Sequence, residues 1–376
     1  MKKTSLFFMG LLVVAVVIGC INNNQEDIPV YSISEAPEAS DISDYIEEIE
    51  FIPINDSLPF GVVSKILLTA KGDFLLLDAT GQILLFEDNC SKVRQPAMKG
   101  RASNEYVSAS DIALRGDTLI ILDNQTIHYF PIYDKEESSS FSLNLKSPCD
   151  AVAPFGTNGV YVFSSFAPKF RDNKTTGDPL LFAVDGSGRL VKEFLDREDC
   201  TFSLFNITQS SGNKYFLRPQ NNENVFYLLG EDGIYPFLKA DFGQKNIPAR
   251  FFYKKADEDI GAYISSDYYK LPLDLYQTKN YVYFRCAGPR ADDVSFVFER
   301  NTHKGFRWTT SPNDGDIRFL ASNDTSFLMI FNYMVDNEKN HGPMFKAISS
   351  FAEQHQIETE KTYLLKIFFS KDILTN

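Results

Sequence analysis

The chain has 376 residues, of which 44% are hydrophobic and 23% charged, so it is long enough and apolar enough to bury a full core. Its 50 acidic and 37 basic side chains give a net charge of −13, the wrong sign for a protein that binds nucleic acid. With 33 Phe and 18 Tyr but only four His, the composition favours β-strands and leaves little room for a histidine-rich metal site.

The N-terminus has the pattern of an export signal. Lys2 and Lys3 precede an apolar run from Leu6 to Ile18, which is too short to span a membrane comfortably. The run ends in Gly19 and Cys20, which resembles a bacterial lipobox, where a cysteine is lipid-modified and becomes the first residue. We therefore predict a lipoprotein signal peptide over residues 1–19 and lipidation of Cys20. The alternative is an ordinary signal peptide with a cysteine there by chance.

The segment after Cys20 is polar and acidic. Residues 20–46 are rich in Asn, Asp, Glu and Ser, a composition typical of flexible linkers. We predict that they form a flexible spacer between a membrane and a folded domain over residues 47–376. A lipid anchor would make the membrane a partner and place the protein in the cell envelope as an outer-membrane lipoprotein. Surface-exposed and periplasm-facing orientations both stay open.

The body of the chain contains a repeated hairpin. Two apolar runs joined by a Gly-Asp turn fill Lys65–Asp78, and the same order recurs in Asp111–Asp123. Both copies end in Leu-Asp, and a further apolar strand follows each. Asp78 and Asp123 lie 45 residues apart, which is near the period of a four-stranded propeller blade.

Weaker copies of this unit start near residues 159, 214, 275 and 317. Short strands separated by turns predict an all-β fold, a six-bladed β-propeller of four-stranded antiparallel blades. Such a ring has to be closed, because its first and last blades otherwise leave exposed edges. We expect the strand at Glu48–Ile54 to join the last blade beside Tyr363–Phe369. One short helix is predicted from Pro343, where helical spacing of apolar residues begins.

Three stretches carry a resemblance to a known family. They are the lipobox with the first hairpin, the loop Met98–Tyr106, and the segment Phe237–Phe252, where Asp241-Phe-Gly precedes a proline. In these features the chain resembles the six-bladed β-propeller lipoproteins of Bacteroidota, relatives in shape of the NHL-repeat propellers. The resemblance implies the fold and an envelope location, and it implies no reaction.

The loop before the second hairpin is the candidate ligand site. It brings together a guanidinium, an amide, a carboxylate and a phenol on Arg101, Asn104, Glu105 and Tyr106. These groups could grip a polar ligand such as a glycan or a peptide, since binding in propellers usually uses loops. The alternative is an ion pair between Arg101 and Glu105 that only shapes the loop.

Signals for catalysis or metal binding are weak. No nucleophile elbow, P-loop or zinc-protease motif occurs. Asp78 and Asp123 end equivalent strands and are weak candidates for a Ca²⁺ site, because Ca²⁺ prefers oxygen ligands. The alternative is that each carboxylate caps its own turn. His128 lies in a predicted strand and is interpreted as a structural residue.

Four cysteines follow Cys20 and are widely spaced, at Cys90, Cys149, Cys200 and Cys286. They contain no CxxC pair, so neither a zinc ribbon nor a redox motif is predicted. An oxidising compartment would permit disulfides, but the sequence does not determine their pairing.

Taken together, the residues favour a non-catalytic module. We predict an envelope-anchored propeller that binds or scaffolds a glycan, a peptide or an envelope protein, with no cofactor and no nucleic-acid partner. The alternative is a Ca²⁺-dependent propeller hydrolase or lyase with its site in the central channel, which requires several oxygen ligands to converge there.

Overall fold

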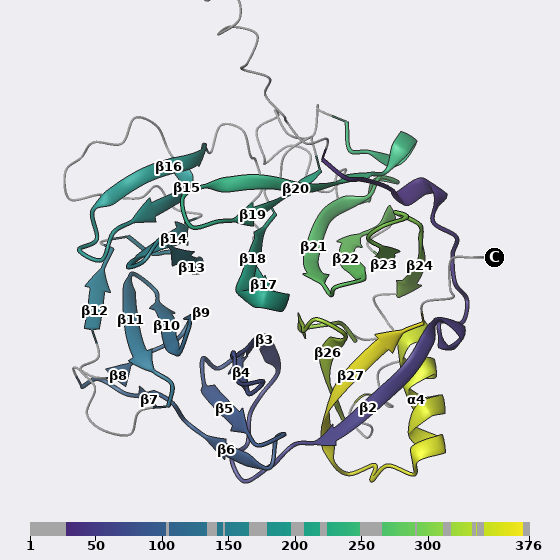
Figure 1. Cartoon of the computed structure of the whole chain (residues 1–376), viewed down its shortest axis with the longest axis horizontal. Helices are drawn as coiled ribbons and strands as arrows, with labels where there is room; N and C mark the ends of the chain where they lie inside the picture. Colours follow the sequence, from purple (N-terminus) through teal and green to yellow (C-terminus); the bar gives the residue numbers. More distant parts are fainter. Residues whose placement is uncertain are drawn as a thin grey trace, which may run out of the picture.

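The computed structural model describes residues 28–102, 105–133, 141–145, 147–164, 179–196, 207–218, 224–248, 265–289, 292–310, 317–332, 336 and 342–370. Within these ranges, six β-sheets are arranged around a ring (Figure 1). The prediction of a six-bladed β-propeller with four-stranded antiparallel blades is confirmed. Cys20, Asn104 and Cys200 lie outside the described residues, as does the predicted signal peptide.

Each blade takes its strands in chain order from the centre outward. Blades 1 to 3 contain β3 (Val63–Leu68), β4 (Phe74–Asp78), β5 (Ile83–Glu87) and β6 (Lys92–Arg94); β9 (Asp111–Arg115), β10 (Thr118–Asp123), β11 (Thr126–Pro131) and β12 (Phe141–Asn144); and β13 (Ala151–Phe155), β14 (Gly159–Phe163), β15 (Pro179–Val184) and β16 (Leu190–Asp196).

Blades 4 to 6 follow the same rule, except that the outermost strand of blade 6 comes from the start of the fold. They contain β17 (Ile207–Ser210), β18 (Lys214–Leu217), β19 (Val225–Leu229) and β20 (Ile234–Asp241); β21 (Lys270–Gln277), β22 (Tyr281–Ala287), β23 (Asp293–Glu299) and β24 (Gly305–Thr310); and β25 (Ala321–Ser322), β26 (Phe327–Asn332), β27 (Thr362–Phe369) and β2 (Ile46–Pro53). A two-stranded sheet of β7 (Met98–Lys99) and β8 (Glu105–Tyr106) connects blades 1 and 2.

The repeated sequence unit forms the hairpins that it predicts. In blades 1 and 2 the Gly-Asp pairs lie at the turns between the first two strands. Gly72 and Gly116 have φ angles of 87° and 55° there, a left-handed conformation that glycine adopts without strain. All five residues of β4 are buried, because this strand lies inside its blade with other blades packed on its two faces.

The two ends of the folded chain close the ring. β2 pairs in antiparallel fashion with β27, placing Ile49 opposite Ile367 and Phe51 opposite Leu365. β27 pairs on its other side with β26, so a strand from the start of the fold becomes the outer strand of blade 6. The predicted closure is confirmed.

The single predicted helix is also present. α4 (Pro343–His355) has its proline at the first turn and ends where Gln356 adopts a left-handed conformation. Its buried residues, Met344, Phe345 and Ile348 among them, belong to one apolar cluster with strands of blades 5 and 6. The helix therefore covers the last blade, as the helical spacing predicts.

The predicted flexible spacer over residues 20–46 requires a correction for its described part. Residues 28–45, called the N-terminal strap here, include β1 (Val30–Ser32) and the short 3-10 helices η1 (Ile33–Glu35) and η2 (Ser43–Tyr45). β1 pairs in parallel with β20 of blade 4 as its fifth strand. Ile33 and Ile42 are fully buried, because the few apolar residues of this acidic stretch pack on the blades.

The strap then crosses blade 5 before it enters blade 6 (Figure 1). The backbone of Arg307 in β24 donates to the Pro37 carbonyl over 3.0 Å and accepts from the Ala39 amide over 2.7 Å. Tyr45 stacks on Phe306 with ring centroids 4.0 Å apart. The strap therefore covers strand edges that would otherwise be open to pairing with another chain.

One predicted strand is shorter than expected. The repeat unit that starts near residue 317 predicts a first strand of blade 6 over Ile317–Leu320, whereas the strand pairing covers only Ala321 and Ser322. Phe319 and Leu320 are nevertheless buried, and the Leu320 amide bonds to the Leu328 carbonyl over 2.8 Å. The apolar pattern therefore predicts the burial of these residues correctly, although regular strand pairing begins only at Ala321.

The centre of the ring is occupied by blade 4. Figure 1 shows β17 and β18 extending into the middle, where the 3-10 turn η4 (Ser211–Asn213) joins them. The Tyr215 hydroxyl accepts from the Leu114 amide over 2.7 Å and donates to its carbonyl over 3.0 Å, across to blade 2. The Ser210 hydroxyl lies 2.9 Å from that of Ser322 in blade 6. Blade 4 thus extends into the centre of the ring and contacts blades 2 and 6 there.

No helix among the described residues is long and apolar enough to cross a membrane. Among the cysteines that the structure describes, Cys90, Cys149 and Cys286 are buried free thiols. Burial raises the pKa of both Cys90 and Cys149 to about 12, which keeps these thiols protonated and unreactive.

Candidate functional site

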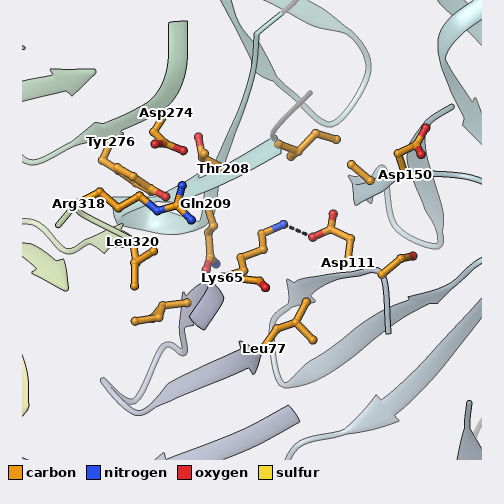
Figure 2. A pocket seen from close by; sticks show the side chains of 15 residues that line it. Lys65, Leu77, Asp111, Asp150, Thr208, Gln209, Asp274, Tyr276, Arg318 and Leu320 are labelled. Carbon is orange, nitrogen blue, oxygen red and sulfur yellow. Dashed lines mark hydrogen bonds and ion pairs between the residues drawn. The ribbon is translucent and has the colours of Figure 1, made fainter. Parts of the chain in front are cut away.

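The inner strands enclose a cavity of about 140 Å³ at the end of the channel where these strands begin. We call it the channel mouth (Figure 2). Every blade contributes to its wall, through residues such as Lys65, Asp111, Ala151, Thr208, Tyr276 and Leu320. A ligand here would touch all six blades, which makes the channel mouth the most central site of the molecule.

A buried ion pair forms one side of the channel mouth. Lys65 in β3 donates to one carboxylate oxygen of Asp111 in β9 over 2.7 Å, the contact drawn as a dashed line in Figure 2. The other oxygen of Asp111 accepts the Val152 amide of β13 over 2.9 Å. Burial raises the pKa of Asp111, and the Lys65 ammonium opposes this. One carboxylate thereby joins blades 1, 2 and 3.

A second buried ion pair, in blade 5, also borders the channel mouth. Arg285 in β22 forms an ion pair with Asp274 in β21, in which the guanidinium Nε donates to the carboxylate over 3.0 Å, and both side chains are 6% exposed. Arg285 also reaches Asp293 in β23 over 3.0 Å. The attraction between the two groups offsets part of the cost of burying them.

Arg318 and Tyr276 complete this side of the wall. Burial raises the pKa of the Tyr276 hydroxyl well above its ordinary value; Asp274 adds to the rise, while the positive charge of Arg318 opposes it. Arg318 is half-buried and points into the cavity beside the Tyr276 ring in Figure 2. A guanidinium and a phenol therefore both line the cavity.

Gln209 of blade 4 closes the channel mouth at its inner end. Its side-chain oxygen accepts the Leu68 amide of blade 1 over 3.1 Å. Its side-chain nitrogen donates to Asn213 over 2.8 Å. Gln209 thus connects the wall of the channel mouth to residues that line a second cavity.

The channel mouth is mixed in charge. Lys65 and Arg318 supply positive charge, and Asp111, Asp150 and Asp274 supply negative charge. Asp111 and Asp274 are each paired with a cation of the chain. Among the described residues, no group of three or more His, Cys, Asp or Glu side chains is placed to hold a metal ion. The arrangement can hydrogen-bond a ligand that carries both donors and acceptors.

The predicted ligand loop lies elsewhere. Figure 1 places β7 and β8 at the perimeter of the ring, and neither Arg101, Glu105 nor Tyr106 lines the channel mouth. Arg101 is exposed, but the Glu105 carboxylate accepts the Ala102 amide over 2.7 Å. Tyr106 is 1% exposed, and burial raises the pKa of its hydroxyl to about 12. The ligand role of this loop stays a prediction.

Asp78 and Asp123 each bind backbone amides. Asp78 accepts the amides of Gly61, Thr80 and Gln82 over 2.8, 2.9 and 2.9 Å. Asp123 accepts the Val107 amide over 2.6 Å. Asp78 thus caps its own turn, whereas Asp123 binds the segment before β9. A role of either residue in Ca²⁺ binding stays a prediction. His128 is held between the Ser142 hydroxyl at 2.8 Å and Asp123 at 3.7 Å, in agreement with a structural role.

Sequence reasoning missed the residues of the channel mouth. The available signal was a charged residue within a buried apolar strand, as at Lys65 and Asp111, since such residues are rarely buried unless they are paired. These two residues are 46 positions apart, close to the repeat length. Their pairing across neighbouring blades depends on the ring, which periodicity alone does not place.

The structure of a known protein shares this architecture. An exported protein of Bacteroides fragilis superposes with a TM-score of 0.70 at 14% identity, over 92% of this chain and all of that one. A Trichoderma reesei carbohydrate-active enzyme of family AA12 gives a TM-score of 0.42 at 13% identity, over 89% of this chain and 98% of its own.

Sequence comparison adds the family. No curated protein matches the sequence significantly. The family described as 6-bladed beta-propeller matches residues 21–318, which include most of the blades and the strap. The chain therefore belongs to this 6-bladed beta-propeller family.

Proposed function

We propose that this propeller is a non-catalytic binding module of the cell envelope, and that its channel mouth receives the end of a peptide. One observation carries the proposal: a cavity of about 140 Å³, lined by all six blades, holds side chains of both charges. A peptide end offers an ammonium or a carboxylate next to amide groups, which matches such a wall.

The size of the cavity limits the size of the ligand that it can hold. A volume of about 140 Å³ is below the range of about 300–1,000 Å³ that is typical for sites of drug-sized molecules. It suits one or two residues at a chain end better than a folded partner. The buried pairs hold their geometry without a ligand, so the wall is pre-organised, which favours binding.

The envelope location rests on the predicted anchor at Cys20 and on the export signal before it. The similar Bacteroides fragilis protein is an exported protein, which supports the same location. A glycan and an envelope protein are the other partners that the sequence suggests, and the experiment below separates a peptide from a glycan.

The test uses the full chain and isothermal titration calorimetry. Probes are unprotected di- and tripeptides, the same peptides acetylated and amidated at their ends, and neutral oligosaccharides. We expect the unprotected peptides to bind, and Arg318→Gln to weaken them about tenfold or more, because a charged hydrogen bond contributes about 1.5–3 kcal/mol. Ligand recovered after incubation should be chemically unchanged by mass spectrometry.

The matched control is Arg189→Gln. Arg189 lies in the turn before β16 with its side chain 69% exposed, so the variant makes the same chemical change away from the channel mouth. It should bind peptides as the unaltered chain does. Equal affinity for capped and uncapped peptides, or no effect of Arg318→Gln, would overturn the proposal.

A further inference from the structure

The inner strands of blades 1, 4 and 6 end at a second and larger cavity, of about 590 Å³. Its wall includes the turns after β3, β17 and β25, whereas the channel mouth uses the beginnings of these strands. Gln209 lines the channel mouth, and its hydrogen bonds join it to Leu68 and Asn213, which line the second cavity. We call the second space the turn cavity.

The turn cavity is lined by small neutral polar groups. Hydroxyl and amide side chains recur around it, as at Thr69, Asn89, Ser211, Asn213, Asn323 and Thr325. Such groups donate and accept hydrogen bonds without carrying charge. Part of the remaining wall is apolar, with Phe74, Leu328 and Leu364. A sugar ring has polar edges and apolar faces, so it matches both parts of this wall.

The charged side chains of the turn cavity have partners within the chain. Lys366 lies 3.0 Å from Glu50, and Asp73 accepts the Tyr133 hydroxyl over 2.9 Å. Asp324 accepts the hydroxyl of Ser211. Lys366 is paired with an opposite charge, whereas the partners of the Asp73 and Asp324 carboxylates are neutral hydroxyl groups. The wall therefore disfavours an anionic ligand, and its neutral hydroxyl and amide groups suit an uncharged one.

One wall of the turn cavity has an unusual backbone. Asp88, Asn89 and Cys90 all have positive φ angles, of 50°, 54° and 67°. Non-glycine residues in this conformation cost free energy, and such strain tends to gather at ligand sites. Asn55 holds the turn in place, since its backbone amide donates to the Cys90 carbonyl over 3.0 Å. The turn presents the exposed Asn89 to the cavity.

From these observations we infer that the turn cavity is a second binding site, for a neutral polyhydroxylated ligand of mono- to disaccharide size. Its volume lies within the range of about 300–1,000 Å³ that small-molecule sites occupy. The site is separate from the channel mouth and does not depend on the peptide proposal.

The test is calorimetric titration of the full chain with neutral hexoses, N-acetylhexosamines and their disaccharides. Thr325→Trp places a large ring at the exposed rim of the turn cavity and should abolish sugar binding. Asn89→Gly removes the amide while glycine accepts the same backbone conformation, so it should weaken binding about five- to tenfold with no loss of thermal stability.

Two matched controls make the result specific. Asn124→Gly makes the same change at an exposed asparagine with a φ of 55° in the turn before β11, away from the turn cavity. Thr302→Trp adds the same ring to an exposed turn of blade 5. Both should bind sugars normally, as should Arg318→Gln. Binding of no sugar in the panel, or undiminished binding by Thr325→Trp, would overturn the inference, while peptide binding reports separately on the channel mouth.

Discussion

Asp78 shows how a single carboxylate can organise a turn in this fold. One of its oxygens accepts the amides of Thr80 and Gln82, and the other accepts the amide of Gly61 from the segment before β3. Burial raises the pKa of Asp78, but the hydrogen bonds lower it further, so the net pKa is below its ordinary value. The folded state therefore prefers the ionised carboxylate.

We predict that Asp78→Asn lowers the free energy of unfolding by about 2 kcal/mol at pH 7, because an amide turns one N–H group toward a backbone N–H. The folded-state pKa lies below the unfolded value, so the stabilisation is complete above about pH 4 and is lost as the pH falls through the folded-state pKa. Urea denaturation of both proteins between pH 3 and 7 should show their difference shrinking at the acid end.

Asp117→Asn is the control for this prediction. Asp117 lies in the exposed hairpin turn of blade 2, so the same change should alter the free energy of unfolding by less than about 0.5 kcal/mol. A difference between wild type and Asp78→Asn that stays constant from pH 3 to 7 would contradict the proposed ionised turn cap.

At the scale of elements, the sequence is informative where a strand is buried on both faces or ends in a turn. The hairpins of blades 1 and 2, α4 and the closing strand β2 could all be predicted, since local periodicity and turn residues define them. The strap could not. Tyr31, Ile33 and Ile42 are isolated apolar residues in an acidic stretch, and only the edges of β20 and β24 give them a surface to pack on.

We predict that Ile42→Ala lowers the free energy of unfolding by about 2–4 kcal/mol, because Ile42 is fully buried within the cluster of blades 5 and 6. Chemical denaturation followed by tryptophan fluorescence suits this test, since the single Trp308 lies in the same cluster. Val62→Ala, at a side chain that is 78% exposed, should change stability by less than about 0.5 kcal/mol. Equal stabilities of the two variants would show that the strap is dispensable.

At the scale of the whole molecule, the channel residues depend on the completed ring. Lys65 and Asp111 come from different blades, and so do Gln209 and Leu68. Periodicity predicts how many blades there are, but it does not predict that blade 4 extends inward and divides the channel. The loop at Arg101 is chemically varied but lies at the perimeter, whereas the position of the inner strands determines which groups meet at the centre.

We predict that ending the chain after Lys361 prevents folding. This removes β27, which lies between β2 and β26 and is the only described link between the two ends of the ring. Circular dichroism and size-exclusion chromatography should then show an unfolded or aggregated chain. Ending the chain after Ser370 keeps every described strand and should preserve a cooperative unfolding transition. A monodisperse, cooperatively unfolding product of the shorter chain would contradict the closure.

The path of the strap also decides how the molecule responds to pulling. Tension applied at the N-terminal end reaches the short pairing of Val30–Ser32 with Lys239–Asp241 first. The backbone bonds at Arg307 come next, and β2 is loaded only after these have parted. Under load, the strap should therefore detach before the ring opens, and the detached residues would lengthen the chain between the point of pulling and the closed ring.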